Sequence, residues 1–203
     1  MADDPGRFWD AKYADDGFFY GTAANAWLTR QRHRLRPGMR ALSIADGEGR
    51  NSVWLAAQGL RVTAVDASAN AVAKAGRLAA ERGVEVHHVH ADLRHWAWPT
   101  AAFDVAIAIF AHFRAEERAV IHRKLLNSLV PGGLVLLEAY SPYQHLYRTG
   151  GPPDLDMLYT AFRLQEDFSD AEILEIGELT TELAEGQGHR GKSAVVRMVA
   201  RRP

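Results

Sequence analysis

Residues 39–66 read MRALSIADGEGRNSVWLAAQGLRVTAVD, and this stretch decides the fold. A short apolar run at 39–44 leads into a turn with two glycines, and the segment 51–58 that follows has helical spacing and stops at Gly59. Residues 61–65 then alternate polar and apolar side chains and include β-branched residues, as strands do. The stretch therefore predicts a strand, a glycine turn, a helix and a second strand.

The same alternation of helix and strand continues along the chain. Ser68 is a suitable N-cap for a second helix, which ends before Gly83. Further on, Pro131-Gly132-Gly133 is expected to break a helix and to precede an almost unbroken apolar strand, the kind that parallel sheets bury on both faces. The remaining predicted elements are strands at 84–89, 103–110 and 134–139 and a helix at 116–129.

Two strand-like runs close the chain, at 173–183 and 193–200, and the glycine-rich segment 186–191 joins them into an expected hairpin. With the preceding elements they predict an α/β fold: a single doubly wound, Rossmann-like domain whose mostly parallel, seven-stranded sheet ends in an antiparallel C-terminal hairpin. Within one domain spanning 1–203, we assign 1–38 to an N-terminal helical segment, 39–140 to the core, 141–170 to an insertion on the substrate side and 171–203 to the closing hairpin.

The composition favours a protein that acts on a small-molecule substrate. The 203-residue chain is 47% apolar, enough for one sizeable core, and its lack of cysteine excludes disulfides, cysteine-ligated metals and a thiol nucleophile. With 24 basic and 25 acidic residues, its net charge is -1, so we expect no nucleic acid as a partner. The N-terminus lacks signal-peptide features and no apolar run is long enough for a bilayer. We therefore expect a cytoplasmic monomer or homodimer that binds no membrane.

The glycine turn and the end of the next strand indicate a nucleoside site. In an open parallel sheet, ligands bind beyond the carboxyl ends of the strands. A turn such as that of Gly47 and Gly49 offers backbone N–H groups and the positive end of a helix to an anionic group. Asp66 ends the second strand, where its carboxylate can accept hydrogen bonds from both ribose hydroxyls. Without a ligand, the same pattern is a tight turn.

The next positions choose between a dinucleotide and S-adenosylmethionine (SAM). Ser52 occupies the place of the third glycine that would let a helix close on a pyrophosphate. SAM carries one carboxylate instead, and its ammonium group would suit an acidic neighbour such as Asp46 or Glu48. Asp92 could accept from the adenine amino group with Leu93 against the ring, although an N-cap is an equal alternative for Asp92. These features favour SAM.

The chain resembles the class I SAM-dependent methyltransferases, in particular the tellurite-resistance type. The core of the resemblance is carried by Gly47-Glu48-Gly49-Arg50-Asn51, Trp54-Leu55-Ala56, Val62-Thr63-Ala64-Val65-Asp66 and Pro131-Gly132-Gly133. Outside the core, Trp9-Asp10-Ala11-Lys12-Tyr13, Tyr20-Gly21 and Asn25 resemble that group's N-terminal lid, and Glu185-Gly186, His189 and Gly191 its closing hairpin. The resemblance implies a SAM-binding core at 39–140, S-adenosylhomocysteine as the product, and a small soft acceptor such as tellurite, selenite or a thiol.

Two positions depart from the pattern of that family. Ser43 stands where an acidic residue is usual, and Ala45 stands where the first glycine is usual. Asp46 is the candidate to take over the contact with the ammonium group. The predicted cofactor-binding residues are Tyr13, Ala45, Asp46, Gly47, Glu48, Gly49, Asp66, Ala67, Asp92 and Leu93, and no metal site is expected.

Methyl transfer from a sulfonium is an in-line displacement that needs alignment and a dry site more than catalytic residues. The aromatic N-terminal segment would exclude water, or would simply pack onto the sheet. Enzymes that methylate nitrogen resemble one another in an Asn/Asp-Pro-Pro-aromatic motif after the fourth strand. Residues 110–114 of this chain lack that motif. His112 is a candidate base or oxyanion ligand, and its alternative is a structural role. His189 and Arg190 are candidates to meet an anionic acceptor, or else form an exposed turn.

Three rival functions are left open. His88, His90 and Asp92 form an H-x-H-x-D motif like that of metallo-β-lactamase-type hydrolases, with His145 and His189 as further ligands, but Leu93 replaces the expected next histidine. An NAD(P)-type oxidoreductase is weakened by Ser52 and by the lack of a Tyr-x-x-x-Lys-like pair. The third is a SAM-sensing domain without enzymatic activity.

Overall fold

The computed structural model describes residues 4–203, and the chain divides into two compact units. The first unit holds residues up to 97 together with 185–187, and the second holds 98–184 and 188–203. The tip of the C-terminal hairpin therefore belongs with the N-terminal half of the chain. The assignment of one domain to residues 1–203 stays a prediction.

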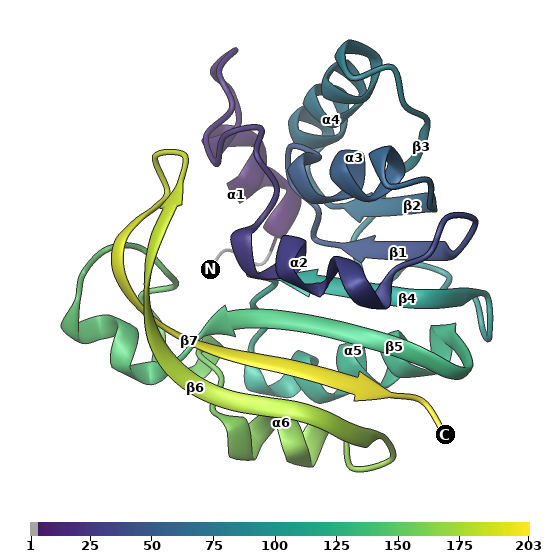
Figure 1. The fold of residues 1–203 in the computed structure, drawn as a ribbon. Helices are drawn as coiled ribbons and strands as arrows, with labels where there is room; N and C mark the ends of the chain where they lie inside the picture. The colour runs from purple at the N-terminus through teal and green to yellow at the C-terminus, as the bar shows by residue number, and fades with distance from the viewer. Residues whose placement is uncertain (1–3) are drawn as a thin grey trace. The chain divides into compact units, whose positions relative to one another are not determined.

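The first unit is built on three parallel strands in the order β3-β2-β1 (Figure 1). Its elements are α1 (Pro5–Lys12), α2 (Ala26–Arg30), the 3-10 helix η1 (Gln31–Arg34), β1 (Arg40–Ile44), α3 (Arg50–Ala57), β2 (Arg61–Asp66), α4 (Ala69–Glu81) and β3 (Val86–His90). Helix α3 packs on β2 and helix α4 on β3. The strand, turn, helix and strand predicted for 39–66 are all present.

Helix α4 begins and packs as its sequence dictates. Ser68 is the N-cap, and its side chain accepts a hydrogen bond from the N–H of Ala71. The buried face carries Ala75, which lies against the glycine turn: a Cβ on Gly49 would be 2.7 Å from the Cβ of Ala75. Gly49 also has a φ of 89°, so only glycine allows both this turn and the close approach of α4.

The second unit continues with four strands in the order β4-β5-β7-β6 (Figure 1). Its elements are β4 (Phe103–Ile109), α5 (Ala115–Ser128), β5 (Leu129–Tyr140), the 3-10 helices η2 (Pro142–Leu146) and η3 (Leu155–Met157), α6 (Ala161–Asp167), β6 (Glu172–Glu185) and β7 (His189–Arg201). Strands β4 and β5 are parallel, whereas β5 and β7 are antiparallel. Helix α5 packs on β4 and β5, and α6 packs on α5 and β7.

Three boundaries differ from the sequence-based expectation. Pro131-Gly132-Gly133 lies inside β5 instead of before it, next to a register shift in the pairing of β4 and β5. Irregular pairing is where proline and glycine are tolerated in a strand. The insertion at 141–170, expected to be irregular, contains η2, η3 and α6. The hairpin turn is also tighter than 186–191, because cross-strand pairing continues to Glu185 and resumes at His189.

No helix within residues 4–203 combines the length and the apolar character that a bilayer crossing requires.

Candidate active site

The glycine turn connects β1 to α3 and has an unusual backbone. Gly47 and Gly49 have φ angles of 61° and 89°, the left-handed region that glycine adopts freely. Ala45 also lies there, with a φ of 45°, although it carries a Cβ. Ala45 occupies the position where glycine is usual in the family that the sequence resembles, and its backbone lies in the region that glycine adopts freely.

Asp46 is fully buried in the turn and is held by two serines. The hydroxyl of Ser43 donates to its Oδ1 at 2.7 Å, and the hydroxyl of Ser52 donates to its Oδ2. Burial raises the pKa of Asp46, and the two serine hydrogen bonds act in the opposite direction. Each oxygen of a carboxylate has a second lone pair, so Asp46 can accept from a ligand as well. Its contact with an ammonium group stays a prediction.

Glu48 is already paired with a cation. Its Oε1 lies 2.8 Å from Nζ of Lys74, and its Oε2 accepts from the N–H of Tyr20 at 3.2 Å. The ammonium of Lys74 also donates to the carbonyl of Gly17 at 2.7 Å. These bonds tie the N-terminal segment to the glycine turn and make Glu48 the weaker candidate for the cofactor's ammonium group.

Asp66 faces the turn from the end of β2. Its Oδ2 accepts from the N–H of Gly47 at 2.7 Å and its Oδ1 from the N–H of Ser68 at 2.8 Å. Burial raises its pKa to about 6, which the two backbone hydrogen bonds partly oppose. A buried carboxylate directly beside a glycine turn fits the hydroxyls of a ribose.

Tyr13 covers the same turn. It is buried, and a Cβ on Gly47 would lie 3.1 Å from its hydroxyl oxygen. Trp9 stacks on Tyr13 with ring centroids 5.5 Å apart, and Tyr20 meets it edge-on at 6.3 Å. Burial raises the pKa of both tyrosines, that of Tyr20 to about 12, so each keeps its proton. The structure brings the predicted aromatic residues to the glycine turn and leaves no room for a side chain at Gly47.

Three other predicted cofactor residues have evident structural partners. Oδ1 of Asp92 accepts from the N–H of Arg94 at 2.9 Å, and its carboxylate pairs with the guanidinium of Arg94 at 2.6 Å. Residues 93–95 form a turn and not a helix, so the helix N-cap alternative for Asp92 is wrong. Leu93 is buried. The carbonyl of Ala67 lies 3.0 Å from Nε2 of His90. Roles of these residues in cofactor binding stay predictions.

The second unit gathers four rings at the carboxyl ends of β4 and β5 and the start of β7. Phe110, immediately after β4, has a φ of 55° although it is not glycine. Its ring lies 4.7 Å from that of Tyr140 and 4.1 Å from that of His189. The ring of His112 stacks on Tyr140 at 5.8 Å. Strained backbone of this kind is concentrated at functional sites, and we call Phe110, His112, Tyr140 and His189 the aromatic cluster.

His112 has a neutral and well-anchored ring. Its Nδ1 lies 2.7 Å from the carbonyl of Met157 and its Nε2 accepts from the N–H of Tyr140 at 3.3 Å, which assigns the proton to Nδ1. Burial lowers the pKa of His112 to about 4. Both nitrogens are engaged within the protein, so the geometry favours the structural alternative over proton transfer.

His189 and Arg190 point in different directions, as neighbours in a strand do. His189 is buried in the aromatic cluster, whereas Arg190 is exposed. The structure therefore brings His112 and His189 together and leaves Arg190 outside the cluster.

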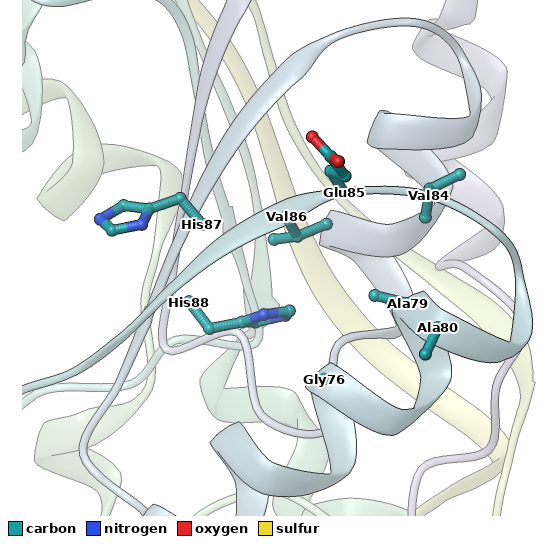
Figure 2. A pocket seen from close by; sticks show the side chains of 8 residues that line it. All are labelled: Gly76, Ala79, Ala80, Val84, Glu85, Val86, His87 and His88. Carbon is teal, nitrogen blue, oxygen red and sulfur yellow. The ribbon is translucent and has the colours of Figure 1, made fainter.

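The rival metal site receives no support. Residues 4–203 contain no group of three His, Asp or Glu side chains placed to hold a metal ion. Figure 2 shows a hollow between α4 and β3 in which the His88 ring extends toward Gly76, whereas the His87 ring points away from α4. Asp92 pairs with Arg94, as described above.

An α/β fold with a glycine turn after β1 and an acid at the end of β2 is shared by dinucleotide-binding domains and the class I methyltransferases. Residues 41–133 match the family model described as a methyltransferase domain. A cypemycin N-terminal methyltransferase from Streptomyces sp is 31% identical over 135 residues, which are 64% of this chain and 53% of that protein. The chain thus spans about half the length of this curated relative.

Solved structures share the fold. TehB from Haemophilus influenzae has a TM-score of 0.72 and 20% identity, covering 98% of this chain and 67% of that one. A solved structure concerned with the conversion of a disulfide bond into a thioacetal group during echinomycin biosynthesis has a TM-score of 0.77 and 21% identity. The match covers 97% of this chain and 91% of that chain. Residues 41–133 therefore match a methyltransferase domain, and the chain has the α/β fold of SAM-dependent methyltransferases, with a mostly parallel seven-stranded sheet whose C-terminal strands are antiparallel.

Several contacts of the site were not predicted from the sequence. The links from Ser43 and Ser52 to Asp46, from Lys74 to Glu48, and the strain at Phe110 have no local pattern that reveals them. Ser43 alone carried a signal, because an acid was expected in its place and Asp46 stood close by in the sequence.

Proposed function

We propose that this chain transfers the methyl group of SAM to a small soft nucleophile, and that this acceptor is an organic thiol. The observation that carries the first part is the buried carboxylate of Asp66 beside the glycine turn, 2.7 Å from the N–H of Gly47. The second part is supported by the aromatic cluster, which has no Asp, Glu, Lys or Arg among its four members.

The residues of the first unit fit SAM. Asp66 would accept hydrogen bonds from the ribose hydroxyls, and the backbone around Gly47 would receive the carboxylate. Asp46 would accept from the ammonium group through its remaining lone pairs. Tyr13 and Tyr20 would keep water away from the turn, because both are held there by packing and by the bond from Tyr20 to Glu48. When bound, SAM supplies an already activated methyl group, so alignment and dryness are the main demands on the protein.

The acceptor is argued from charge. A tellurite or selenite oxyanion would need a cation, but His112 is kept neutral by burial and Arg190 is exposed. A small thiol enters as a neutral molecule and suits contact with aromatic rings. We propose that Phe110 and Tyr140 contact the thiol and that the imidazole of His189 accepts the thiol proton. The sulfur then bonds to the methyl carbon as the bond from that carbon to the sulfonium of SAM breaks, which leaves S-adenosylhomocysteine. A relative bearing the name of an N-terminal methyltransferase adds a peptide amine as the acceptor to be tested against.

The test is a competition among acceptors. The purified chain is incubated with methyl-labelled SAM and, separately, a small aliphatic thiol, an aromatic thiol, selenite, tellurite and a short peptide with a free amine. We expect S-adenosylhomocysteine and a methyl sulfide with at least one thiol. Asp66→Ala should form the same product only at much higher SAM, because losing the ribose hydrogen bonds costs about 1–3 kcal/mol of binding. Turnover with the oxyanions or the amine alone would replace the thiol as acceptor, and turnover with none of the panel would refute the function.

A further inference from the structure

The loop that follows β4, residues 111–115, is braced by one segment of the substrate-side insertion. The hydroxyl of Tyr159 donates to the carbonyl of Ala111 at 3.1 Å and accepts from the N–H of Phe113 at 2.6 Å. One side chain therefore satisfies two backbone groups of the loop, two residues apart. The distance in sequence between these partners is 48 and 46 residues.

Two more bonds join the same two segments. The carbonyl of Met157 lies 2.7 Å from Nδ1 of His112, and Oδ2 of Asp156 accepts from the N–H of Ala115 at 3.0 Å. Every loop residue from 111 to 115 except Arg114 thus has a bond to the segment 156–159 among these contacts. We call the segment 156–159 the brace.

Tyr159 is itself held rigidly. Its side chain is fully buried, and its own N–H donates to the carbonyl of Tyr140 at the end of β5 at 3.0 Å. The guanidinium of Arg118 lies 5.6 Å from its ring centroid, and the ring of His122 meets it edge-on at 5.5 Å. Arg118 and His122 both bind Asp167, at 2.6 Å and 2.7 Å, so helices α5 and α6 hold the tyrosine from behind.

The loop 111–115 directly follows Phe110 of the aromatic cluster. Phe110 holds its left-handed backbone directly before Ala111, and His112 is a member of both the loop and the cluster. Strained backbone persists only where its surroundings impose it. The hydroxyl of Tyr159 is a buried group that imposes the path of the chain at this point.

We propose that Tyr159 is a positioning residue for methyl transfer: its hydroxyl fixes the loop 111–115 and thereby the aromatic cluster that meets the acceptor. The inference rests on the proposed function. Tyr159 acts through the loop and touches neither acceptor nor cofactor. Loss of the hydroxyl should lower turnover of the acceptor and leave cofactor affinity unchanged, because the predicted cofactor residues all lie in the first unit.

The experiment compares Tyr159→Phe with Tyr143→Phe, a matched loss of one hydroxyl from a tyrosine that is 65% exposed. In Tyr159→Phe we expect hydrogen exchange at the Phe113 amide to accelerate by about tenfold or more, because a buried donor loses its acceptor. With saturating SAM and thiol, kcat should fall about tenfold, while the KM for SAM and the Kd of S-adenosylhomocysteine stay within about twofold. Tyr143→Phe should match the wild type in every measurement.

Each outcome decides a separate claim. Unchanged exchange at Phe113, or accelerated exchange with unchanged kcat, would overturn the positioning role of Tyr159. A wild-type chain that methylates none of the acceptors would overturn the proposed function, and the positioning role with it. If circular dichroism shows Tyr159→Phe unfolded, Asp156→Ala and Asp156→Asn take its place. Only the alanine variant should accelerate exchange at Ala115 and lower kcat, since asparagine retains an acceptor oxygen.

Discussion

At the scale of single residues, the two serines beside the glycine turn, Ser43 and Ser52, have one explanation. A buried carboxylate is costly unless hydrogen bonds satisfy it. Ser43 replaces the usual acid of β1 and Ser52 replaces the third glycine of a dinucleotide site, and both hydroxyls bind Asp46. The acidic residue therefore lies in the turn instead of at the end of β1, and Ser43 and Ser52 supply the two hydrogen bonds that it needs.

Asp66 is predicted to make the binding of the cofactor product S-adenosylhomocysteine dependent on pH. Its pKa, raised by burial from 3.8 to about 6, means that the carboxyl is largely protonated below about pH 6 in the folded chain. An ionised carboxylate is needed to accept from both ribose hydroxyls, so the Kd of S-adenosylhomocysteine should rise up to about tenfold per pH unit below pH 6. Titration calorimetry between about pH 5 and pH 7.5 measures this, with Asp66→Asn as the variant whose affinity should be weaker and flat across that range.

The same pKa has the opposite consequence for folding. A raised pKa favours the protonated, folded chain, so this contribution to the free energy of unfolding is complete below about pH 3.8 and is lost as the pH rises through about 6. In the binding titration, a wild-type Kd of S-adenosylhomocysteine that stays constant between about pH 5 and pH 7.5 would contradict the prediction. It would show that Asp66 is ionised throughout, or that it lies away from the ribose.

At the scale of elements, the tip of the β6-β7 hairpin is anchored to the N-terminal segment. Glu185 accepts from Nη1 of Arg50 at 2.6 Å, from Nδ2 of Asn25 at 3.0 Å and from the N–H of Ala26 at 3.1 Å. The next residue, Gly186, has a φ of 65°, and a Cβ there would lie 2.5 Å from the carbonyl oxygen of Phe19. The anchor thus depends on a buried carboxylate and on a glycine that admits close backbone contact.

Gly186→Ala should detach this tip. The new Cβ meets backbone atoms that cannot rotate away, and the positive φ adds strain, so we expect a loss of roughly 1–3 kcal/mol in the free energy of unfolding. Urea denaturation measures that loss, and exchange at the amides of residues 18–21 and 187 should accelerate. Gly177→Ala, within β6, is the control, because nothing lies within 4 Å of a Cβ at that position. Equal stability of the two variants would mean that the tip contacts contribute little.

At the scale of the whole molecule, the two units carry different groups of candidate residues. All ten predicted cofactor residues belong to the first unit, and the three predicted catalytic residues belong to the second. Elements of both units fall within the matched methyltransferase model, residues 41–133. This distribution predicts that a ligand of the first unit alone should stabilise the chain.

A thermal-shift comparison tests the choice of ligand for the whole chain. S-adenosylhomocysteine at about 100 times its Kd should stabilise the folded state by about 2.7 kcal/mol, because it binds only that state. NADH at the same concentration should leave Tm unchanged, since the side chain of Ser52 stands where a pyrophosphate turn needs glycine and is engaged with Asp46. A rise of Tm with NADH and none with the nucleoside would support the oxidoreductase alternative.

The sequence by itself determined the types and order of the elements in the core 39–140 and the place of the glycine turn. Apolar periodicity and glycine are local signals, so β1, α3, β2 and the N-cap Ser68 were predicted close to their observed bounds. The tertiary structure alone decided which side chains meet. It paired Asp46 with two serines, buried His189 while exposing Arg190, and brought Tyr159 to Ala111 and Phe113. The contacts of Tyr159 join residues 48 and 46 positions apart, and the burial of His189 depends on which face of a strand is covered. The bonds from the two serines to Asp46 depend on the backbone path of the turn, so none of these contacts is encoded in the spacing of neighbouring residues.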